Sequence, residues 1–87
     1  MTTDSEPVSR QLTVYSRFGC HLCTDMLQAL TRLQPLLGFE FTVVDVDDDP
    51  ALAREYGERV PVLLAGDAEL CCHFLDEERL REYYRNS

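Results

Sequence analysis

The sequence predicts an α/β fold in which a central mixed four-stranded sheet is flanked by helices in the order βαβαββα. A short strand runs directly into a stretch with helical periodicity and then into a second strand, which requires a right-handed crossover to a parallel partner. Two later apolar runs flank Gly66-Asp67, a dipeptide typical of a tight antiparallel hairpin. A capped segment with helical spacing follows the hairpin. Each element has its own local signal.

The first half of the chain contains the predicted βαβ unit. Residues Leu12–Tyr15 combine β-branched and aromatic side chains, so we expect a short buried strand there. Apolar residues recur every three or four positions from Leu22 onward and predict a helix that Pro35 stops. A second strand is predicted from Phe39 to Val46, with one face formed by Phe39, Phe41, Val43 and Asp45.

The middle of the chain predicts a short helix and then the hairpin. Asp49-Pro50 fits an N-cap followed by proline at the first helical position, and Gly57 closes this helix. The strands Val62–Ala65 and Glu69–Phe74 should pair antiparallel across the tight turn.

A last helix and a polar N-terminal segment set the limits of the domain. Asp76 can cap a helix with acidic residues at its positive end and arginines near its negative end, and its residues available for burial are Leu80, Tyr83 and Tyr84. Residues 1–10 hold almost nothing apolar and are predicted to form a disordered tail. Because 87 residues allow one modest core, we expect a single domain over residues 11–87.

The charge and hydropathy of the chain exclude several classes of function. The formal net charge is -8, and every basic residue is an arginine. A nucleic-acid partner is therefore not expected, because binding requires clustered cations that displace phosphate counterions. No apolar run approaches the roughly 20 residues that span a bilayer, and the first residues are polar rather than signal-like. We expect a monomeric cytoplasmic protein without a membrane partner.

Two of the four cysteines form the motif Cys20-His21-Leu22-Cys23 at the start of the first predicted helix. Without a signal-like start, this spacing indicates redox or metal chemistry rather than a secreted disulfide framework. Unpaired N–H groups and the positive end of the helix dipole favour the Cys20 thiolate, to which Arg17 and His21 add positive charge. We expect Cys20 to attack a disulfide and Cys23, one turn further on, to resolve the mixed disulfide.

Other interpretations of the cysteines remain open. A structural disulfide or half of a zinc site has the same spacing. Zinc or iron–sulfur binding is the main alternative, since the chain supplies sulfur and nitrogen ligands in Cys20, His21, Cys23, Cys71, Cys72 and His73. An adaptor that binds partners without turnover is a third possibility. The redox interpretation requires no cofactor and no metal.

Cys71 and Cys72 are adjacent on a predicted strand, so their side chains should point to opposite faces of the sheet. We expect one of them to be buried as a small apolar residue. A vicinal disulfide or a regulatory thiol is the alternative for this pair.

Three segments together resemble the glutaredoxin-like branch of the thioredoxin superfamily: Val14–Cys23, Val44–Asp47 and Arg59–Val62. The resemblance implies a thioredoxin-like fold and a thiol–disulfide oxidoreductase that acts on protein or small-molecule disulfides and depends on a reducing partner. It also implies a cis peptide bond at Val60-Pro61, beside the cysteines, where the backbone of an extended substrate can pair. The substrate-binding residues would be Arg17, His21, Leu22, Val60 and Pro61, with Arg17 either meeting a substrate carboxylate or remaining a solvated surface residue.

The sequence departs from the usual patterns of that superfamily in two places. Glutaredoxins usually follow the last strand with a Gly-Gly turn and an acidic residue that hold glutathione, whereas this chain has His73-Phe74-Leu75-Asp76. Glutathione binding is therefore not predicted. Thioredoxins usually carry a tryptophan just before the first cysteine and a buried aspartate six residues before it, and here those positions are Gly19 and Val14.

Overall fold

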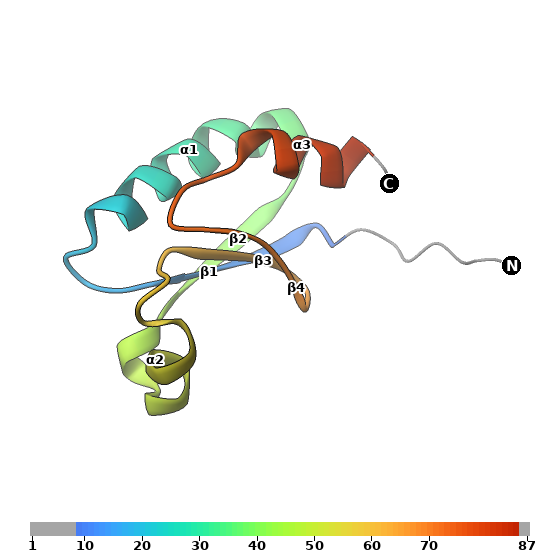
Figure 1. Cartoon of the computed structure of the whole chain (residues 1–87). Helices are drawn as coiled ribbons and strands as arrows, with labels where there is room; N and C mark the ends of the chain where they lie inside the picture. The colour runs from blue at the N-terminus through green and yellow to red at the C-terminus, as the bar shows by residue number, and fades with distance from the viewer. Residues whose placement is uncertain (1–8, 86–87) are drawn as a thin grey trace, which may run out of the picture.

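The computed structural model describes residues 9–85, which form a four-stranded sheet with helices on both sides (Figure 1). The elements follow the predicted order, with one additional 3-10 turn after the second strand. Among the described residues, no helix is long and apolar enough to cross a membrane. The elements are β1 (Gln11–Ser16), α1 (His21–Leu37), β2 (Glu40–Asp45), η1 (Val46–Asp48), α2 (Pro50–Tyr56), β3 (Val62–Ala65), β4 (Ala68–Cys72) and α3 (Glu77–Arg85).

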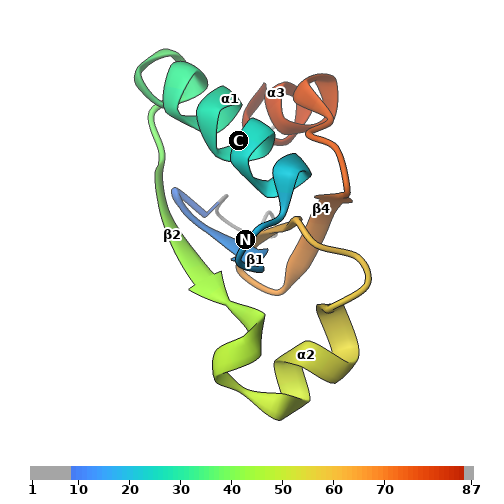
Figure 2. The ribbon, with the colours of Figure 1, turned by 90° about the vertical axis from the view of Figure 1, so that its left-hand side faces the viewer.

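The sheet is mixed, as predicted, with the strand order β2-β1-β3-β4. β1 and β2 run parallel, whereas β1 pairs antiparallel with β3 and β3 pairs antiparallel with β4. Helices α1 and α3 lie together on one face of the sheet, and α2 lies on the other side (Figures 1 and 2). Because β1 and β3 are antiparallel, with Tyr15 opposite Val62, the loop after β1 and the loop before β3 meet at one end of the sheet.

The main core lies between the sheet and the helices α1 and α3. Each of these elements contributes buried apolar side chains, so burial of apolar surface holds the two layers together. Leu12, Leu30, Leu33, Leu63 and Leu80 have no solvent-exposed surface. The helical period of α1 and the alternation in β1 therefore meet in one core, as the apolar spacing predicts.

The end of α1 differs from the prediction. We expected Pro35 to stop the helix, but α1 continues through Leu37 with Pro35 inside its last turn. A proline there removes one intrahelical hydrogen bond, and the buried residues one turn earlier still hold the helix against the sheet. The helix ends instead at Gly38, which adopts a left-handed φ of 76° and donates its N–H to the carbonyl of Gln34 at 2.8 Å.

Two aspartates set the boundaries of the segment between β2 and α2. β2 was predicted to extend from Phe39 to Val46 but spans Glu40–Asp45, because Asp45 accepts a hydrogen bond from the N–H of Asp47 at 2.9 Å and starts η1. Asp49 then caps α2 by accepting from the N–H of Ala51 at 2.9 Å, as predicted. This capped turn joins the edge strand to α2.

The second hairpin strand is also shorter than predicted. β4 spans Ala68–Cys72 rather than Glu69–Phe74. It ends because His73 turns into the left-handed region with a φ of 67°, which breaks the extended backbone. The cap of α3 matches the prediction, since Asp76 accepts a hydrogen bond from the N–H of Arg79 at 3.0 Å.

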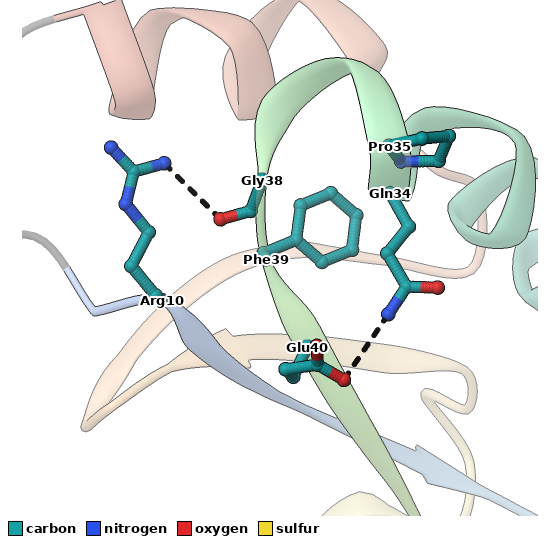
Figure 3. A pocket seen from close by; sticks show the side chains of 6 residues that line it. All are labelled: Arg10, Gln34, Pro35, Gly38, Phe39 and Glu40. Atoms are coloured by element: carbon teal, nitrogen blue, oxygen red, sulfur yellow. Dashed lines mark hydrogen bonds between the residues drawn. The ribbon is translucent and has the colours of Figure 1, made fainter.

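Most of the predicted N-terminal tail, residues 1–8, lies outside the described residues. Ser9 and Arg10 are described, and both contact the end of the domain opposite the cysteine motif. The carbonyl of Ser9 accepts a hydrogen bond from the hydroxyl of Tyr84 at 2.9 Å, and the Arg10 guanidinium lies over the Tyr84 ring. Arg10 also donates to the carbonyl of Gly38 beside a shallow hollow of about 350 Å³ that Phe39 and Glu40 help to line (Figure 3).

Candidate functional site

The loop between β1 and α1 is a tight turn that presents Cys20. The N–H of Cys20 donates to the carbonyl of Arg17 at 3.2 Å, which closes a four-residue turn. Gly19, its third residue, has a φ of 79°, a conformation that a side chain at this position would disfavour. The turn therefore requires the glycine that directly precedes the first cysteine.

Cys20 and Cys23 lie at the N-terminus of α1 with different exposure. Cys20 is the N-cap, and its Sγ accepts a hydrogen bond from the N–H of Cys23 at 3.1 Å. Cys20 is half-buried, whereas only 3% of the Cys23 surface is exposed. Their Cα atoms are 5.2 Å apart and their sulfur atoms are paired as a disulfide. Cys20 is thus the more exposed of the two cysteines.

The Val60-Pro61 peptide bond is cis, as the family resemblance implied. Pro61 is fully buried and directly precedes β3, whose first residue pairs with Tyr15 near the end of β1. The cis bond and the cysteine loop therefore occupy the same end of the sheet, which faces the viewer in Figure 2. The substrate-pairing role of Val60 and Pro61 stays a prediction.

Arg17 lies at this end but is engaged within the chain. Its Nε and Nη2 donate to the two carboxylate oxygens of Asp47 at 3.1 and 3.0 Å, and its Nη1 donates to the carbonyl of Gly57 at 3.2 Å. Gly57 is buried beneath the guanidinium, where an added Cβ would lie 2.7 Å from Nη2. The carboxylate-binding role predicted for Arg17 is untested, and a substrate carboxylate would have to compete with Asp47.

His21 and Leu22 differ in their surroundings. The His21 side chain is 88% exposed, and its Nε2 lies 3.6 Å from Oδ2 of Asp25. Leu22 is half-buried and lines a hollow of about 200 Å³ together with Asp25, Met26, His73, Phe74 and Leu75. This hollow therefore lies between the first turns of α1 and the segment after β4.

His73 determines the shape of that segment. Its N–H donates to the carbonyl of Pro61 at 2.8 Å, and its Nε2 lies 3.3 Å from the carbonyl of Glu58. A positive φ at a non-glycine residue costs on the order of 1 kcal/mol, so these contacts must compensate for it. His73 thus takes a conformation that glycine adopts easily, at the point where glutaredoxins usually have a Gly-Gly turn.

Cys71 and Cys72 are both free thiols, and both are half-buried. We expected one of the two to be fully buried, and this prediction is wrong. Cys71 packs against the main core, and burial raises the pKa of its thiol. Sγ of Cys72 lies 3.9 Å from Nδ1 of His73. Within residues 9–85, no group of three His, Cys, Asp or Glu side chains could hold a metal ion, so the six possible ligands do not form one metal site within the chain.

Two aromatic residues at this end were missed by the sequence analysis. Phe18, in the cysteine turn, is 95% exposed, and Phe74, beside the hollow, is 68% exposed. Phe18 stands in the short connection before Cys20, next to predicted site residues, and this placement could have identified it, whereas Phe74 falls at the end of a predicted strand and had no such signal.

A family model described as "Glutaredoxin-like domain (DUF836)" matches residues 11–84. This chain belongs to the glutaredoxin-like domain family. The match covers every strand and nearly all of the last helix, and it includes both cysteines of the motif.

This chain is similar to two solved structures and to a protein known by its sequence. Protein Ne2328 of Nitrosomonas europaea, solved by NMR, is 44% identical with a TM-score of 0.77, covering 95% of this chain and 98% of that one. An uncharacterized protein of Mycobacterium tuberculosis is 36% identical over 76 residues, 82% of this chain and 78% of its own. Glutaredoxin C1 of Populus tremula x tremuloides has a TM-score of 0.53 at 23% identity, covering 87% of this chain and 75% of that one, which supports the thioredoxin-like fold alone.

Proposed function

We propose that this protein is a thiol–disulfide oxidoreductase in which Cys20 is the attacking residue and Cys23 the resolving residue. The observation that carries the proposal is the asymmetry of the pair. Cys20 is the half-exposed N-cap of α1, while Cys23 is buried one turn further along the helix and is paired with it as a disulfide. Membership of the glutaredoxin-like domain family supports the same chemistry.

The reaction is a two-electron exchange that begins with the reduced form of the protein. The Cys20 thiolate attacks one sulfur of a substrate disulfide, forms a mixed disulfide and releases the other sulfur as a thiolate. Cys23 then loses its proton and attacks the Cys20 sulfur of the mixed disulfide, which releases the second substrate thiolate. The substrate gains two electrons and takes up two protons from solvent as its thiolates protonate. An external thiol or dithiol reductant returns the protein to its reduced form.

The start of α1 favours this order of events. In the described structure the N–H of Cys23 points at the Cys20 sulfur, and this donor would stabilise a thiolate at the same position. The N-terminal end of the helix dipole acts in the same direction. Cys23 has no comparable exposure, so it attacks the adjacent Cys20 sulfur of the mixed disulfide more readily than a free substrate disulfide.

The decisive experiment is a redox titration against glutathione buffers, with the protein's thiols trapped and counted by mass. We expect the wild-type protein to show one reversible two-electron transition. The single variants Cys20→Ser and Cys23→Ser should each lose it, because neither can close the Cys20–Cys23 disulfide. The double variant Cys71→Ser/Cys72→Ser is the control and should retain the transition, since these two thiols are free in the structure. A wild-type protein without this transition would refute the proposal.

Turnover separates the roles of the two cysteines. With a small neutral disulfide as substrate and dithiothreitol as reductant, we expect Cys20→Ser to lose at least 100-fold in activity, because the accessible nucleophile is gone. Cys23→Ser, incubated with the same disulfide and no dithiothreitol, should instead accumulate a stable mixed disulfide at Cys20, detectable by mass. If Cys20→Ser remained active and Cys23→Ser did not, the two assignments would have to be exchanged.

A further inference from the structure

Exposed aromatic side chains flank the candidate nucleophile. Within residues 9–85, four large apolar side chains are exposed, and two of them, Phe18 and Phe74, belong to the cysteine end. Phe18 lies two residues before Cys20, in the turn that presents it, and Phe74 borders the hollow beside the first turns of α1. Large apolar surface gathered beside a reactive group is typical of a surface that contacts another molecule.

The hollow between Leu22 and Phe74 suits one side chain of a bound chain. Its volume of about 200 Å³ is below the roughly 300 to 1,000 Å³ of most small-molecule sites. Leu22, Met26, Phe74 and Leu75 provide apolar walls, and the carboxylate of Asp25 is the acidic group among its lining residues. An apolar side chain fits this lining, and a neighbouring basic residue would complement the carboxylate.

Two arginines at this end of the sheet are already paired with carboxylates. Arg17 is bound to Asp47, and Arg59 donates to both carboxylate oxygens of Glu69 at 3.0 and 2.8 Å. The net charge of the whole chain is -8, which attracts cationic partners over long range and repels anionic ones. Glutathione disulfide is an anion with four carboxylates, and at Arg17 and Arg59 these would have to compete with Asp47 and Glu69.

We propose that the site selects polypeptide disulfides in which the attacked cysteine has an apolar neighbour and a basic neighbour, and that it disfavours glutathione disulfide. The apolar side chain occupies the hollow between Leu22 and Phe74, the ring of Phe18 covers the other side of the disulfide, and the basic residue lies near Asp25. This inference rests on the proposed function of Cys20 and Cys23 and names the class of substrate for that site.

The test compares kcat/KM for four disulfides, with dithiothreitol as reductant and the uncatalysed rate subtracted. They are 2-hydroxyethyl disulfide, glutathione disulfide, and two short cyclic peptides of equal length. One peptide carries Leu and Lys beside its cysteine, and the other carries Ser and Glu at the same positions. We expect the Leu/Lys peptide to exceed both the Ser/Glu peptide and glutathione disulfide by at least tenfold.

Variants of the surface identify which residues select the peptide. The quantity followed is the ratio of kcat/KM for the Leu/Lys peptide to kcat/KM for 2-hydroxyethyl disulfide. Phe74→Ser and Phe18→Ser should each lower this ratio about fivefold, and Asp25→Asn should lower it by a similar factor that vanishes at high salt. Leu36→Ser is the matched control, since Leu36 is also exposed but lies in the last turn of α1, and it should leave the ratio unchanged.

The outcomes distinguish the two proposals. If 2-hydroxyethyl disulfide is reduced but glutathione disulfide matches the Leu/Lys peptide, or the two peptides react equally, the substrate preference is wrong and the proposed function stands. Ratios unchanged in both phenylalanine variants would likewise overturn the assigned surface. A protein that reduces none of the four disulfides would refute the proposed function and this inference together.

Discussion

At the scale of single residues, Arg17 joins three parts of the structure around the cysteine turn. Its carbonyl holds the N–H of Cys20, while its guanidinium binds Asp47 in η1 and the carbonyl of Gly57 after α2. The planar guanidinium of an arginine has several N–H donors and can make these hydrogen bonds together, whereas the ammonium group of a lysine is a single compact charge. Arg17 is also only partly exposed, so its pairing is less weakened by water than that of a fully solvated ion pair.

The substitution Arg17→Lys tests this anchoring role. We expect it to lower the free energy of unfolding by about 1 kcal/mol, because the paired hydrogen bonds to Asp47 and the bond to Gly57 cannot all be kept. Arg32→Lys is the control, since Arg32 contacts Glu77 through one nitrogen at 3.2 Å and is more exposed, and a change within about 0.5 kcal/mol is expected. Urea denaturation measures the free energy of unfolding of both variants. Equal decreases in the two variants would show that the hydrogen bonds of the Arg17 guanidinium do not anchor the cysteine turn.

At the scale of elements, the length of α1 depends on its C-terminal cap. Pro35 does not end the helix, and Gly38 does so by adopting a left-handed conformation with its N–H bound to the carbonyl of Gln34. Arg10 adds a hydrogen bond from its Nη1 to the carbonyl of Leu37 at 2.9 Å, which satisfies another free group at the helix end. The cap therefore joins α1, the chain before β1 and the start of β2.

Substitutions at Gly38 separate conformational strain from steric conflict. An added Cβ at Gly38 would meet nothing within 4 Å, so the effect of Gly38→Ala comes from the backbone alone. We expect Gly38→Ala to lower the free energy of unfolding by about 1 kcal/mol, and Gly38→Asn to lower it less, because asparagine tolerates the left-handed region. Thermal unfolding followed by circular dichroism is the measurement. If both variants were as stable as the wild type, the left-handed cap would not be the feature that ends α1.

At the scale of the whole molecule, the fold has a buried tyrosine far from the cysteines. Tyr84 packs with Phe39 in the core and donates its hydroxyl to the carbonyl of Ser9, so it links α3, the start of β2 and the chain before β1. Burial raises the pKa of Tyr84 to about 12 from its usual value of 10.0. The folded protein therefore holds this proton more tightly than the unfolded chain.

This difference predicts how stability depends on pH at the alkaline end. Because the pKa is raised in the folded state, the contribution is fully present below about pH 10 and is lost as the pH rises toward 12, by on the order of 1 to 2 kcal/mol. Urea denaturation at successive pH values measures the slope. Tyr84→Phe should reduce the slope and leave the part that comes from Tyr56 and Cys71, whose pKa values are also raised. A slope undiminished in Tyr84→Phe would assign the whole effect to these other groups.

Features of the fold that depend on near neighbours in the chain could be predicted from local sequence. Helical spacing predicted α1, the caps at Asp49 and Asp76 predicted the starts of α2 and α3, and Gly66-Asp67 predicted the hairpin. The mixed sheet followed from the order of these elements, because a βαβ unit and a hairpin allow few arrangements. The helical periodicity that begins at Leu22 also placed Cys20 and Cys23 at the N-terminus of α1. Periodicity and capping can be predicted in this way because they act within a few residues.

Features that depend on residues far apart in the chain become visible only in the folded protein. Arg17 contacts Asp47 and Gly57 only once the crossover and α2 have folded. The ion pair of Arg17 therefore cannot be predicted from the residues next to it in the sequence. His73 takes its left-handed conformation while its N–H is bound to the carbonyl of Pro61, and that turn leaves Phe74 exposed beside the hollow. Hydrogen bonds and packing between distant segments set these positions, and such contacts exist only once the sheet has brought the loops to one end.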